Sequence, residues 1–296
     1  MEAVVAASNE EAIEAWNGVL FDRFLQYRDI VTTGLGAHGE EALRSNPPPA
    51  GARVLDVGCG FGDTTQQLAR MVGPEGSVVG IDAAARFIEL ADAEARAAGI
   101  ANASFVVGDV QASQLPGERF DFAFSRFGTM FFANPVAALR NVRQALVPGG
   151  RLCMVVWRRK LDNHWLYRAE QVVEQFVTEP EESDEPTCGP GPFSMAGADT
   201  TSDVVRLAGF EQIALRRCDI EIAIGASLEQ AVEFVMALGP AGEVIRLAGA
   251  DAERIRPQIT AALRDALGEY VCDDGHVRAT ASTWIVTASA PAAAGS

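Results

Sequence analysis

Several features that mark other classes of protein are missing from this chain. It has 24 Lys and Arg against 40 Asp and Glu, a formal net charge of -16, and no basic run or stripe. Nucleic-acid binding depends on basic groups that contact phosphates, so no nucleic-acid partner is expected. No stretch reaches the roughly 18 apolar residues of a membrane-spanning helix, and the amino end lacks the pattern of a secretory signal. Neither membrane insertion nor export is predicted.

Cysteine is scarce, and its pattern excludes two further classes. The cysteines are odd in number and include no Cys-x-x-Cys pair, so neither a disulfide framework nor a zinc site is expected. No His-Glu-x-x-His sequence or close carboxylate cluster indicates another metal. This usage is typical of reduced thiols, and we expect a cytoplasmic protein. The cysteines are Cys59, Cys153, Cys188, Cys218 and Cys272.

The composition is that of an ordinary globular protein. Apolar residues make up 48% of the 296 residues and charged residues 22%. A chain of this length can bury a large core, and it fits either one enlarged α/β domain or one domain with a smaller cap. No internal repeat is evident.

The most informative stretch is 53–63, Arg-Val-Leu-Asp-Val-Gly-Cys-Gly-Phe-Gly-Asp. Its first half suits a strand buried on both faces. Gly58, Gly60 and Gly62 then allow a tight turn and a close approach of the backbone to a ligand. A helix should follow, with Asp63 or Thr64 as its cap.

Two kinds of cofactor loop use glycines in this position. A dinucleotide fingerprint, Gly-x-Gly-x-x-Gly, requires a third glycine where this chain has Asp63. A carboxylate there would repel a pyrophosphate, and Asp56 adds a second negative charge at the end of the strand. The loop therefore favours a cofactor that carries positive charge over a nicotinamide dinucleotide.

A second acid supports a nucleoside ligand. Asp82 ends the predicted strand 77–82, about 20 residues after Gly62, the separation at which a strand-end acid can accept hydrogen bonds from ribose hydroxyls. The alternative is an acid that ends a strand by chance. We favour the ribose interpretation because the spacing and the predicted fold agree.

These motifs resemble a known family. Asp56, Gly58, Gly60 and Gly62 form the pattern Asp-x-Gly-x-Gly-x-Gly, which resembles the first motif of class I S-adenosylmethionine-dependent methyltransferases. Residues 125–135, Ser-Arg-Phe-Gly-Thr-Met-Phe-Phe-Ala-Asn-Pro, resemble the UbiE-like small-molecule group. The resemblance implies an α/β, Rossmann-like, doubly wound, mostly parallel seven-stranded sheet with the last strand antiparallel, plus helical cap insertions. It also implies S-adenosyl-L-methionine as cofactor and S-adenosyl-L-homocysteine as product.

The resemblance assigns roles within the cofactor half. Asp109, at the end of strand 103–110, would bind the adenine amino group, although it is also a plausible turn aspartate after Gly108. Phe87 would touch the adenine, and Ser125 would lie near the methionine part. The full predicted cofactor set is Asp56, Gly58, Cys59, Gly60, Gly62, Asp82, Ala83, Phe87, Asp109, Val110 and Ser125.

The acceptor half is less specified, and no catalytic residue is assigned. Arg126 ends the predicted strand 120–126 and would either hold an acidic acceptor group or pair with a surface acid. His164 follows the fifth strand, 151–157, and would be a base or a substrate contact, or simply an exposed histidine. Trp165, its neighbour, is the third predicted substrate contact.

The chain divides into four predicted parts. Residues 1–49 form a helical segment whose apolar stripe packs on the main domain, and the resemblance places Trp16 or Tyr27 over the cleft. Residues 50–157 form the cofactor core. Residues 158–198 form a cap insertion with a helix at 165–177, in which the acidic, proline-rich run 179–186 is either a solvated loop or a lid. Residues 199–290 complete the sheet around a helical insertion, 227–268, with helices at 227–238 and 251–267.

The predicted activity is methyl transfer to an O, N or C atom of a small-molecule metabolite by in-line displacement. A cofactor-binding regulatory or scaffold protein without turnover is the alternative, because the same acids serve binding in both cases. The predicted partner is a small-molecule acceptor, with no nucleic acid and no membrane. The sequence does not indicate the oligomeric state.

Overall fold

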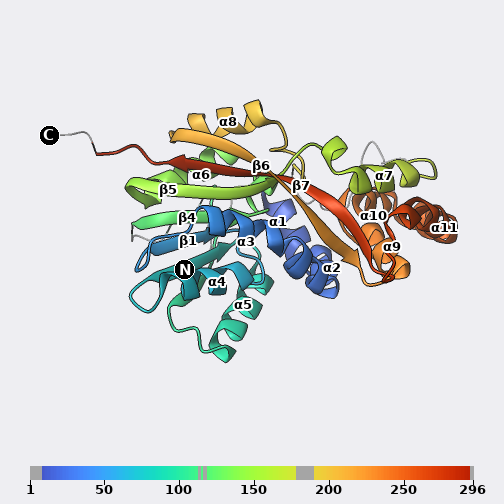
Figure 1. Cartoon of the computed structure of the whole chain (residues 1–296), viewed down its shortest axis with the longest axis horizontal. Helices are drawn as coiled ribbons and strands as arrows, with labels where there is room; N and C mark the ends of the chain where they lie inside the picture. Colours follow the sequence, from blue (N-terminus) through green and yellow to red (C-terminus); the bar gives the residue numbers. More distant parts are fainter. Residues whose placement is uncertain (1–8, 113–114, 116–118, 178–189, 294–296) are drawn as a thin grey trace.

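The computed structural model describes residues 9–112, 115, 119–177 and 190–293 (Figure 1). Seven strands form one sheet in the order β3-β2-β1-β4-β5-β7-β6, with helices on both faces. β7 is antiparallel to β5 and to β6, whereas the other strand pairs are parallel. The predicted doubly wound sheet with an antiparallel last strand is therefore confirmed.

The elements have the following bounds. The strands are β1 (Arg53–Val57), β2 (Ser77–Asp82), β3 (Ala103–Val107), β4 (Phe120–Arg126), β5 (Leu146–Trp157), β6 (Glu211–Gly225) and β7 (Val277–Ser289). The α-helices are α1 (Glu10–Asn17), α2 (Val19–Gln26), α3 (Gly36–Ser45), α4 (Asp63–Val72), α5 (Ala85–Ala97), α6 (Pro135–Ala145), α7 (His164–Val173), α8 (Ala198–Leu207), α9 (Leu228–Ala237), α10 (Gly239–Arg254) and α11 (Arg256–Leu267).

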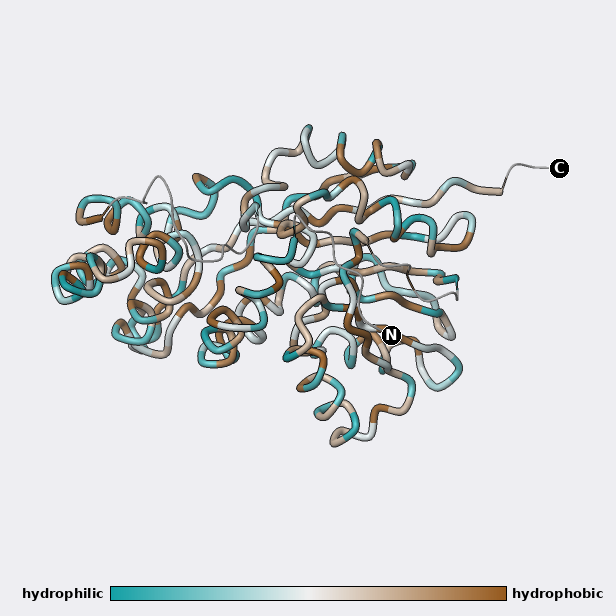
Figure 2. The backbone as a smooth tube through the Cα atoms, turned by 180° about the vertical axis from the view of Figure 1, so that it is seen from behind, coloured by the Kyte–Doolittle hydropathy of each residue, from teal (hydrophilic) through white to brown (hydrophobic). Residues whose placement is uncertain are grey.

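The central strands are buried on both faces, as their continuous apolar sequences require. In β1, Val54 belongs to the cluster that contains Leu68 of α4, whereas Leu55 belongs to the cluster that contains Leu139 of α6. Figure 2 shows hydrophobic residues concentrated along these strands and alternating with polar ones along the helices. The sheet is thus the middle of three layers.

The topology places a cleft beyond the carboxyl ends of β1 and β4. β1 pairs with β2 on one side and with β4 on the other, so the strand order reverses between them. Ligands of open α/β sheets bind at this reversal, because the connections leave the sheet in opposite directions there.

A long antiparallel ribbon carries a helical cap toward the same end of the sheet. β7 pairs with β5 only from Thr283 onward, whereas its pairing with β6 begins at Val277. The ribbon therefore projects beyond Trp157, the last residue of β5. α9, α10 and α11 lie between β6 and β7 in the sequence and cluster near the projecting end (Figure 1).

Several predicted helix boundaries are wrong. The stripe at the amino end belongs to two helices, because Gly18 leaves helical geometry with φ -106° and ψ -116°. The helix predicted at 251–267 is interrupted at Ile255, whereas its predicted start agrees with a break within α10 at Gly249, where φ is 51° and ψ is -125°. Pro257 lies in the first turn of α11, where its missing N–H costs nothing.

Two smaller expectations also fail, and one falls outside the structure described. Neither Asp63 nor Thr64 caps α4, because Gly62 occupies the N-cap position and no side chain caps that helix. The helix predicted at 165–177 ends at Val173. The acidic run 179–186 lies outside the described residues.

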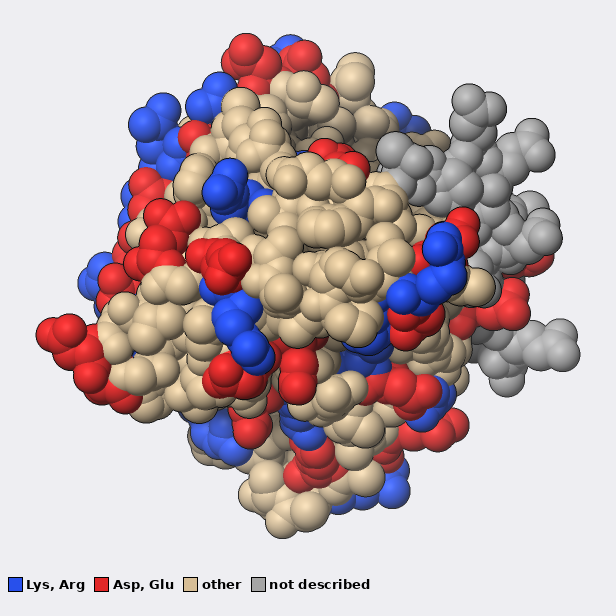
Figure 3. All heavy atoms as spheres, turned by 90° about the vertical axis from the view of Figure 1, so that its right-hand side faces the viewer, with Lys and Arg blue, Asp and Glu red and all other residues tan. Residues whose placement is uncertain are grey.

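Charges of both signs mix on the face that presents the C-terminal helices. Figure 3 shows acidic and basic side chains interspersed around an area of other residues. Some acids are paired within one helix or between neighbours, as Asp251 is with Arg254 and Glu253 with Arg256. No described helix has both the length and the apolar content needed to cross a membrane.

Candidate active site

The glycine loop after β1 has the geometry that its sequence requires. Gly58, Gly60 and Gly62 have φ values of 68°, 52° and 75°, in the left-handed region that favours glycine. The N–H groups of Gly58 and Cys59 both donate to the carbonyl of Ile81, which ties the loop to the end of β2. The loop thus lies over the reversal point of the sheet.

The three glycines have different surroundings. A Cβ on Gly58 would lie 3.0 Å from Cα of Gly128, and one on Gly62 would lie 2.7 Å from the Phe105 ring. A Cβ on Gly60 would have only Phe87 nearby, at 4.0 Å, and Gly60 lines a cavity of about 770 Å³. Gly58 and Gly62 therefore permit close packing, whereas Gly60 leaves room for a ligand.

The Asp82 carboxylate lines this cavity and holds the loop. Its Oδ2 accepts from the N–H of Gly60 and its Oδ1 from the N–H of Ala84, both at 3.0 Å. Burial raises the pKa of Asp82, while its bonds from backbone N–H groups oppose that shift. Its position fits a carboxylate that accepts hydrogen bonds from the hydroxyls of a ribose.

Asp109 and Phe87 line the same part of the cavity. Asp109 is buried, and its Oδ1 accepts from the backbone and side-chain N–H groups of Gln111, at 2.9 and 3.2 Å. Phe87 packs edge-on against Phe21, with ring centroids 4.8 Å apart. Two acids, a fixed ring and an open glycine thus surround one space, and this set fits a cationic nucleoside such as S-adenosylmethionine.

Not every predicted cofactor residue reaches the cavity. Gly58, Cys59, Ala83 and Val110 line it, as do the four residues described above: Gly60, Asp82, Phe87 and Asp109. Asp56, Gly62 and Ser125 do not belong to the lining. The Ser125 hydroxyl donates to the carbonyl of Val57 at 2.7 Å and so joins β4 to the start of the loop.

The charges at the loop differ from those assumed from the sequence. Asp56 is buried and accepts from the Thr65 hydroxyl at 2.6 Å, and burial raises the pKa of Asp56 to about 7. Asp63 pairs with Arg126 at 2.6 Å. Asp56 is therefore only partly ionised near neutral pH, and Asp63 is compensated. Selectivity for a cation must depend mainly on Asp82 and Asp109.

The three predicted acceptor residues lie in different surroundings. Arg126 lines the cavity, but Asp63 and the Thr64 hydroxyl, 3.2 Å from Nε, hold its guanidinium. Trp165 also lines the cavity. His164 does not, because its exposed ring lies with Nδ1 2.8 Å from the hydroxyl of Tyr270. The structure thus brings two of the three together.

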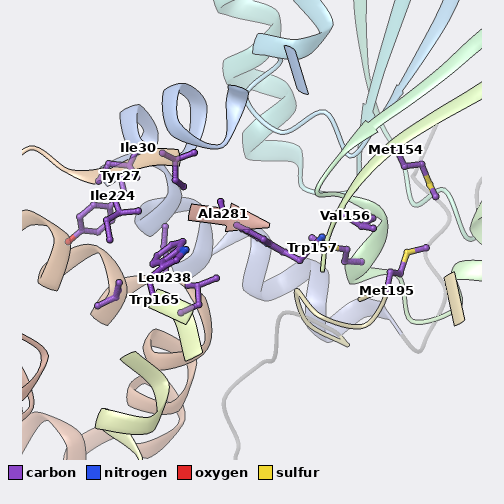
Figure 4. Packing of buried hydrophobic residues seen from close by; sticks show 14 of the residues in the cluster. Tyr27, Ile30, Met154, Val156, Trp157, Trp165, Met195, Ile224, Leu238 and Ala281 are labelled. Atoms are coloured by element: carbon purple, nitrogen blue, oxygen red, sulfur yellow. Dashed lines mark hydrogen bonds between the residues drawn. The ribbon is translucent and has the colours of Figure 1, made fainter. Parts of the chain in front are cut away.

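Aromatic side chains form much of the other half of the cavity. Trp16 of α1 has its ring 5.0 Å from that of Phe131 and 6.4 Å from that of Phe87, so it lies between the two halves. On another part of the lining, Phe127 lies against Trp157, with centroids 4.9 Å apart. Figure 4 shows Trp157 and Trp165 within the same buried cluster, Trp165 next to Leu238. Tyr27 is buried in the core and does not belong to the lining.

Sequence reasoning missed two charged pairs in this half. Lys160 and Glu170 pair at 2.6 Å, and both line the cavity. Glu243 of α10 lines it too and pairs with Arg246. The place of Lys160, shortly after β5, was the available signal, because ligands bind beyond the carboxyl ends of the strands. For Glu243 no sequence signal existed.

Gly58 offers a test of the loop. We expect Gly58→Ala to lower the free energy of unfolding and to abolish binding of S-adenosylhomocysteine, because the methyl group meets the backbone of Gly128. Gly99→Ala is the matched control, since φ is 69° there, at the end of α5, and nothing lies within 4 Å. The control should lose only the roughly 1–2 kcal/mol that a left-handed alanine costs. Denaturant unfolding and calorimetric titration measure both, and equal losses in the two variants would contradict the close-contact role of Gly58.

Comparisons with known proteins agree with this site. A model of the methyltransferase domain matches residues 49–188. Aklanonic acid methyltransferase DauC of Streptomyces sp. (strain C5) is 36% identical over 114 residues, 38% of this chain and 52% of that protein. UbiE, the ubiquinone/menaquinone biosynthesis C-methyltransferase of Pseudomonas aeruginosa (strain LESB58), is 34% identical over 115 residues, 38% and 45% of the two chains. The match thus spans about half the length of these curated relatives.

Solved structures share the fold. Haemonchus contortus phosphoethanolamine N-methyltransferase 2, solved with S-adenosyl-L-methionine, aligns with a TM-score of 0.56 at 15% identity, covering 97% of this chain and 60% of that one. YcgJ of Bacillus subtilis aligns with a TM-score of 0.53 at 17% identity, covering 87% and 97%. Residues 49–188 thus match a methyltransferase domain, and the curated relatives over this part of the chain include DauC and UbiE.

Proposed function

We propose that this protein transfers the methyl group of S-adenosylmethionine to an O, N or C atom of a small-molecule metabolite. The observation that carries the proposal is one cavity with two unlike halves. Asp82 and Asp109 line the half beside the glycine loop, and aromatic rings line the half under the helical cap. A cofactor and a second organic molecule would thus share one enclosed space.

The residues of the first half would hold the cofactor. When bound, the cofactor supplies a methyl group on a positively charged sulfur, and the acceptor atom attacks this methyl carbon in line as the sulfur leaves. Asp82 would accept from the ribose hydroxyls, and Asp109 from the adenine amino group. Phe87 would lie against the adenine. Cys59, next to Gly60 in the lining, would limit the space beside the sulfur.

The residues of the second half would align the acceptor and exclude water. In-line displacement gains most from holding the two reactants in a reactive geometry, which rigid aromatic walls can do. Trp157 is fixed by Phe127 on one side and lies 6.3 Å from Phe193 on the other. Such walls favour a flat ring system. By their names, relatives methylate aklanonic acid and demethylmenaquinone, both of which contain fused rings.

We further propose a division of labour along the chain. Residues 50–157 would hold the cofactor, while the described parts of 1–49 and 158–198, together with the insertion at 227–268, would enclose the acceptor. Ile13, Trp16, Leu166 and Val244, from α1, α7 and α10, support this division because they all line the cavity. A reducing, cytoplasmic setting is supported by the four described cysteines, all of which are free thiols.

Two measurements test the proposed function. Calorimetric titration with S-adenosylhomocysteine should give saturable binding with one site per chain, whereas NAD should give none. Incubation with methyl-labelled cofactor and a panel of hydroxylated naphthalenes, anthraquinones and aliphatic alcohols should label aromatic members. Binding without labelled product from any of them would favour the non-catalytic scaffold, and absence of binding would contradict the assignment of the cofactor.

A further inference from the structure

The acceptor half of the cavity contains an ion pair that the cofactor does not need. Nζ of Lys160 lies 2.7 Å from Oε1 and 2.6 Å from Oε2 of Glu170, and both residues line the cavity. The side chains are 35% and 11% exposed, so the pair is partly withdrawn from water. Desolvating two charges is costly, and replacing such a pair by apolar residues is often neutral or stabilising. Stability alone therefore does not explain this pair.

A series of rings leads from the glycine loop to Lys160. Phe127 directly precedes Gly128, whose backbone abuts Gly58. The Phe127 ring lies 4.9 Å from Trp157, and Trp157 lies 6.3 Å from Phe193. Nζ of Lys160 is 5.8 Å from the centroid of Phe193. A flat molecule along these rings would extend from the region of the loop toward the ammonium group.

The ammonium group of Lys160 favours a particular kind of ligand atom. It has three N–H bonds, so at least one is left after Lys160 has bonded to both oxygens of Glu170. A cation favours an oxygen that accepts without donating, and an ionised oxygen does so best. Arg23 of α2 and Glu243 of α10 are the other charged residues on the walls of this half, while Arg126 is already paired with Asp63.

We propose that Lys160, positioned by Glu170, binds the ionised phenolic oxygen of a flat aromatic acceptor. This inference rests on the proposed function and narrows its substrate class. The ionised phenol is also the more nucleophilic form, at oxygen and at the adjacent ring carbons. Lys160 is thus a positioning and specificity-determining residue.

The test uses alizarin, a dihydroxyanthraquinone whose visible spectrum changes when its phenol ionises. The dye is titrated into the full-length protein saturated with S-adenosylhomocysteine, and the ionisation of the bound dye is followed from pH 5 to 9. A cation within about 4–6 Å lowers the pKa of an acid by roughly 1–3 units. We therefore expect the midpoint of bound alizarin to lie at least about one pH unit lower in the wild type than in Lys160→Met.

Two variants separate charge from folding. Lys160→Arg should retain the low midpoint, because the cation is kept. Arg159→Met is the matched control, since the neighbouring Arg159 is 67% exposed and pairs with Asp162, and it should leave the midpoint unchanged.

The outcomes also separate this inference from the proposed function. If alizarin binds but ionises at the same pH in the wild type and in Lys160→Met, the role of Lys160 is wrong, while methyl transfer is unaffected. If alizarin does not bind to protein that still binds S-adenosylhomocysteine, the phenolic class is wrong. Loss of S-adenosylhomocysteine binding in the wild type would contradict the proposed function itself.

Discussion

Replacing Asp82 with asparagine should weaken binding of S-adenosylhomocysteine at least about 100-fold, because hydrogen bonds to a charged group contribute about 1.5–3 kcal/mol each. The carboxylate already accepts from the N–H groups of Gly60 and Ala84. Its remaining lone pairs face the cavity, where the ribose hydroxyls would bind. An amide keeps the size of the side chain but loses the charge and turns an N–H toward one of these donors. Calorimetric titration measures the loss.

Asp121 supplies the matched control for this substitution. It is also a strand aspartate, in β4, and it accepts from the backbone N–H of Arg53 at 2.8 Å. Arg53 begins β1, so Asp121 lies at the end of the sheet away from the glycine loop. Asp121→Asn should lower stability slightly and leave the affinity for S-adenosylhomocysteine unchanged. An Asp82→Asn protein that binds within about threefold of the wild type would remove the main support for the ribose site.

His38 should make the protein lose stability in mild acid. The side chain is fully buried, and Nδ1 lies 3.1 Å from the Thr283 hydroxyl, which itself donates to the carbonyl of Cys218. Nδ1 is therefore the protonated nitrogen, and Nε2 has no partner among the described residues. Burial lowers the pKa of His38 from 6.5 to about 4, and the nearby Arg126 acts in the same direction, whereas Asp219 opposes it.

The direction of the stability change follows from the difference in the pKa of His38 between the unfolded and the folded protein. The unfolded chain binds this proton more readily than the folded one, so the free energy of unfolding falls as the pH drops below about 6.5 toward 4. The expected loss is about 2 kcal/mol between pH 7.5 and 5 and about 3 kcal/mol by pH 4. Urea unfolding at a series of pH values measures it.

His38→Asn isolates this contribution. The asparagine amide can still donate to Thr283 but does not titrate, so this variant should lack the histidine part of the pH dependence even if it is less stable overall. The comparison is needed because Asp56 changes the stability in the opposite direction. Its pKa is raised to about 7, so its contribution to the free energy of unfolding falls as the pH rises from about 3.8 to 7. Parallel stability curves for the wild type and His38→Asn would contradict the prediction.

The cofactor half of the cavity was predictable because its signals are local. The strand, the glycines and the helix after them are contiguous in the sequence. Asp82 ends β2, and Asp109 follows two residues after the end of β3 in the same sheet. Parallel strands bring their carboxyl ends together, so a position in the sequence becomes a position in space. The charge of Asp56 was not predictable, since it depends on burial that only the packed structure defines.

The acceptor half was only partly predictable, because its residues meet through tertiary packing. His164 and Lys160 both follow β5, yet only Lys160 lines the cavity. His164 begins α7 and turns its ring toward Tyr270, a residue 106 positions away in the sequence. Phe127, Trp157 and Phe193 likewise come from three separate segments. Which of these side chains point into the cavity depends on the rotation of each helix and on contacts between distant residues, and neither can be read directly from a single sequence.

The contact between the N-terminal helices and the helical cap also bears on the order in which the two halves of the cavity form during translation. Nη1 of Arg23 donates to the carbonyl of Ala237 at 3.1 Å, across 214 residues. A ribosome releases the glycine loop and strands β1 to β5 long before α9, α10 and β7. A nascent chain can therefore assemble the nucleoside half first, while the aromatic chamber stays open on one side until the final strand inserts between β5 and β6. The proposed methyl transfer would then have to await the release of β7.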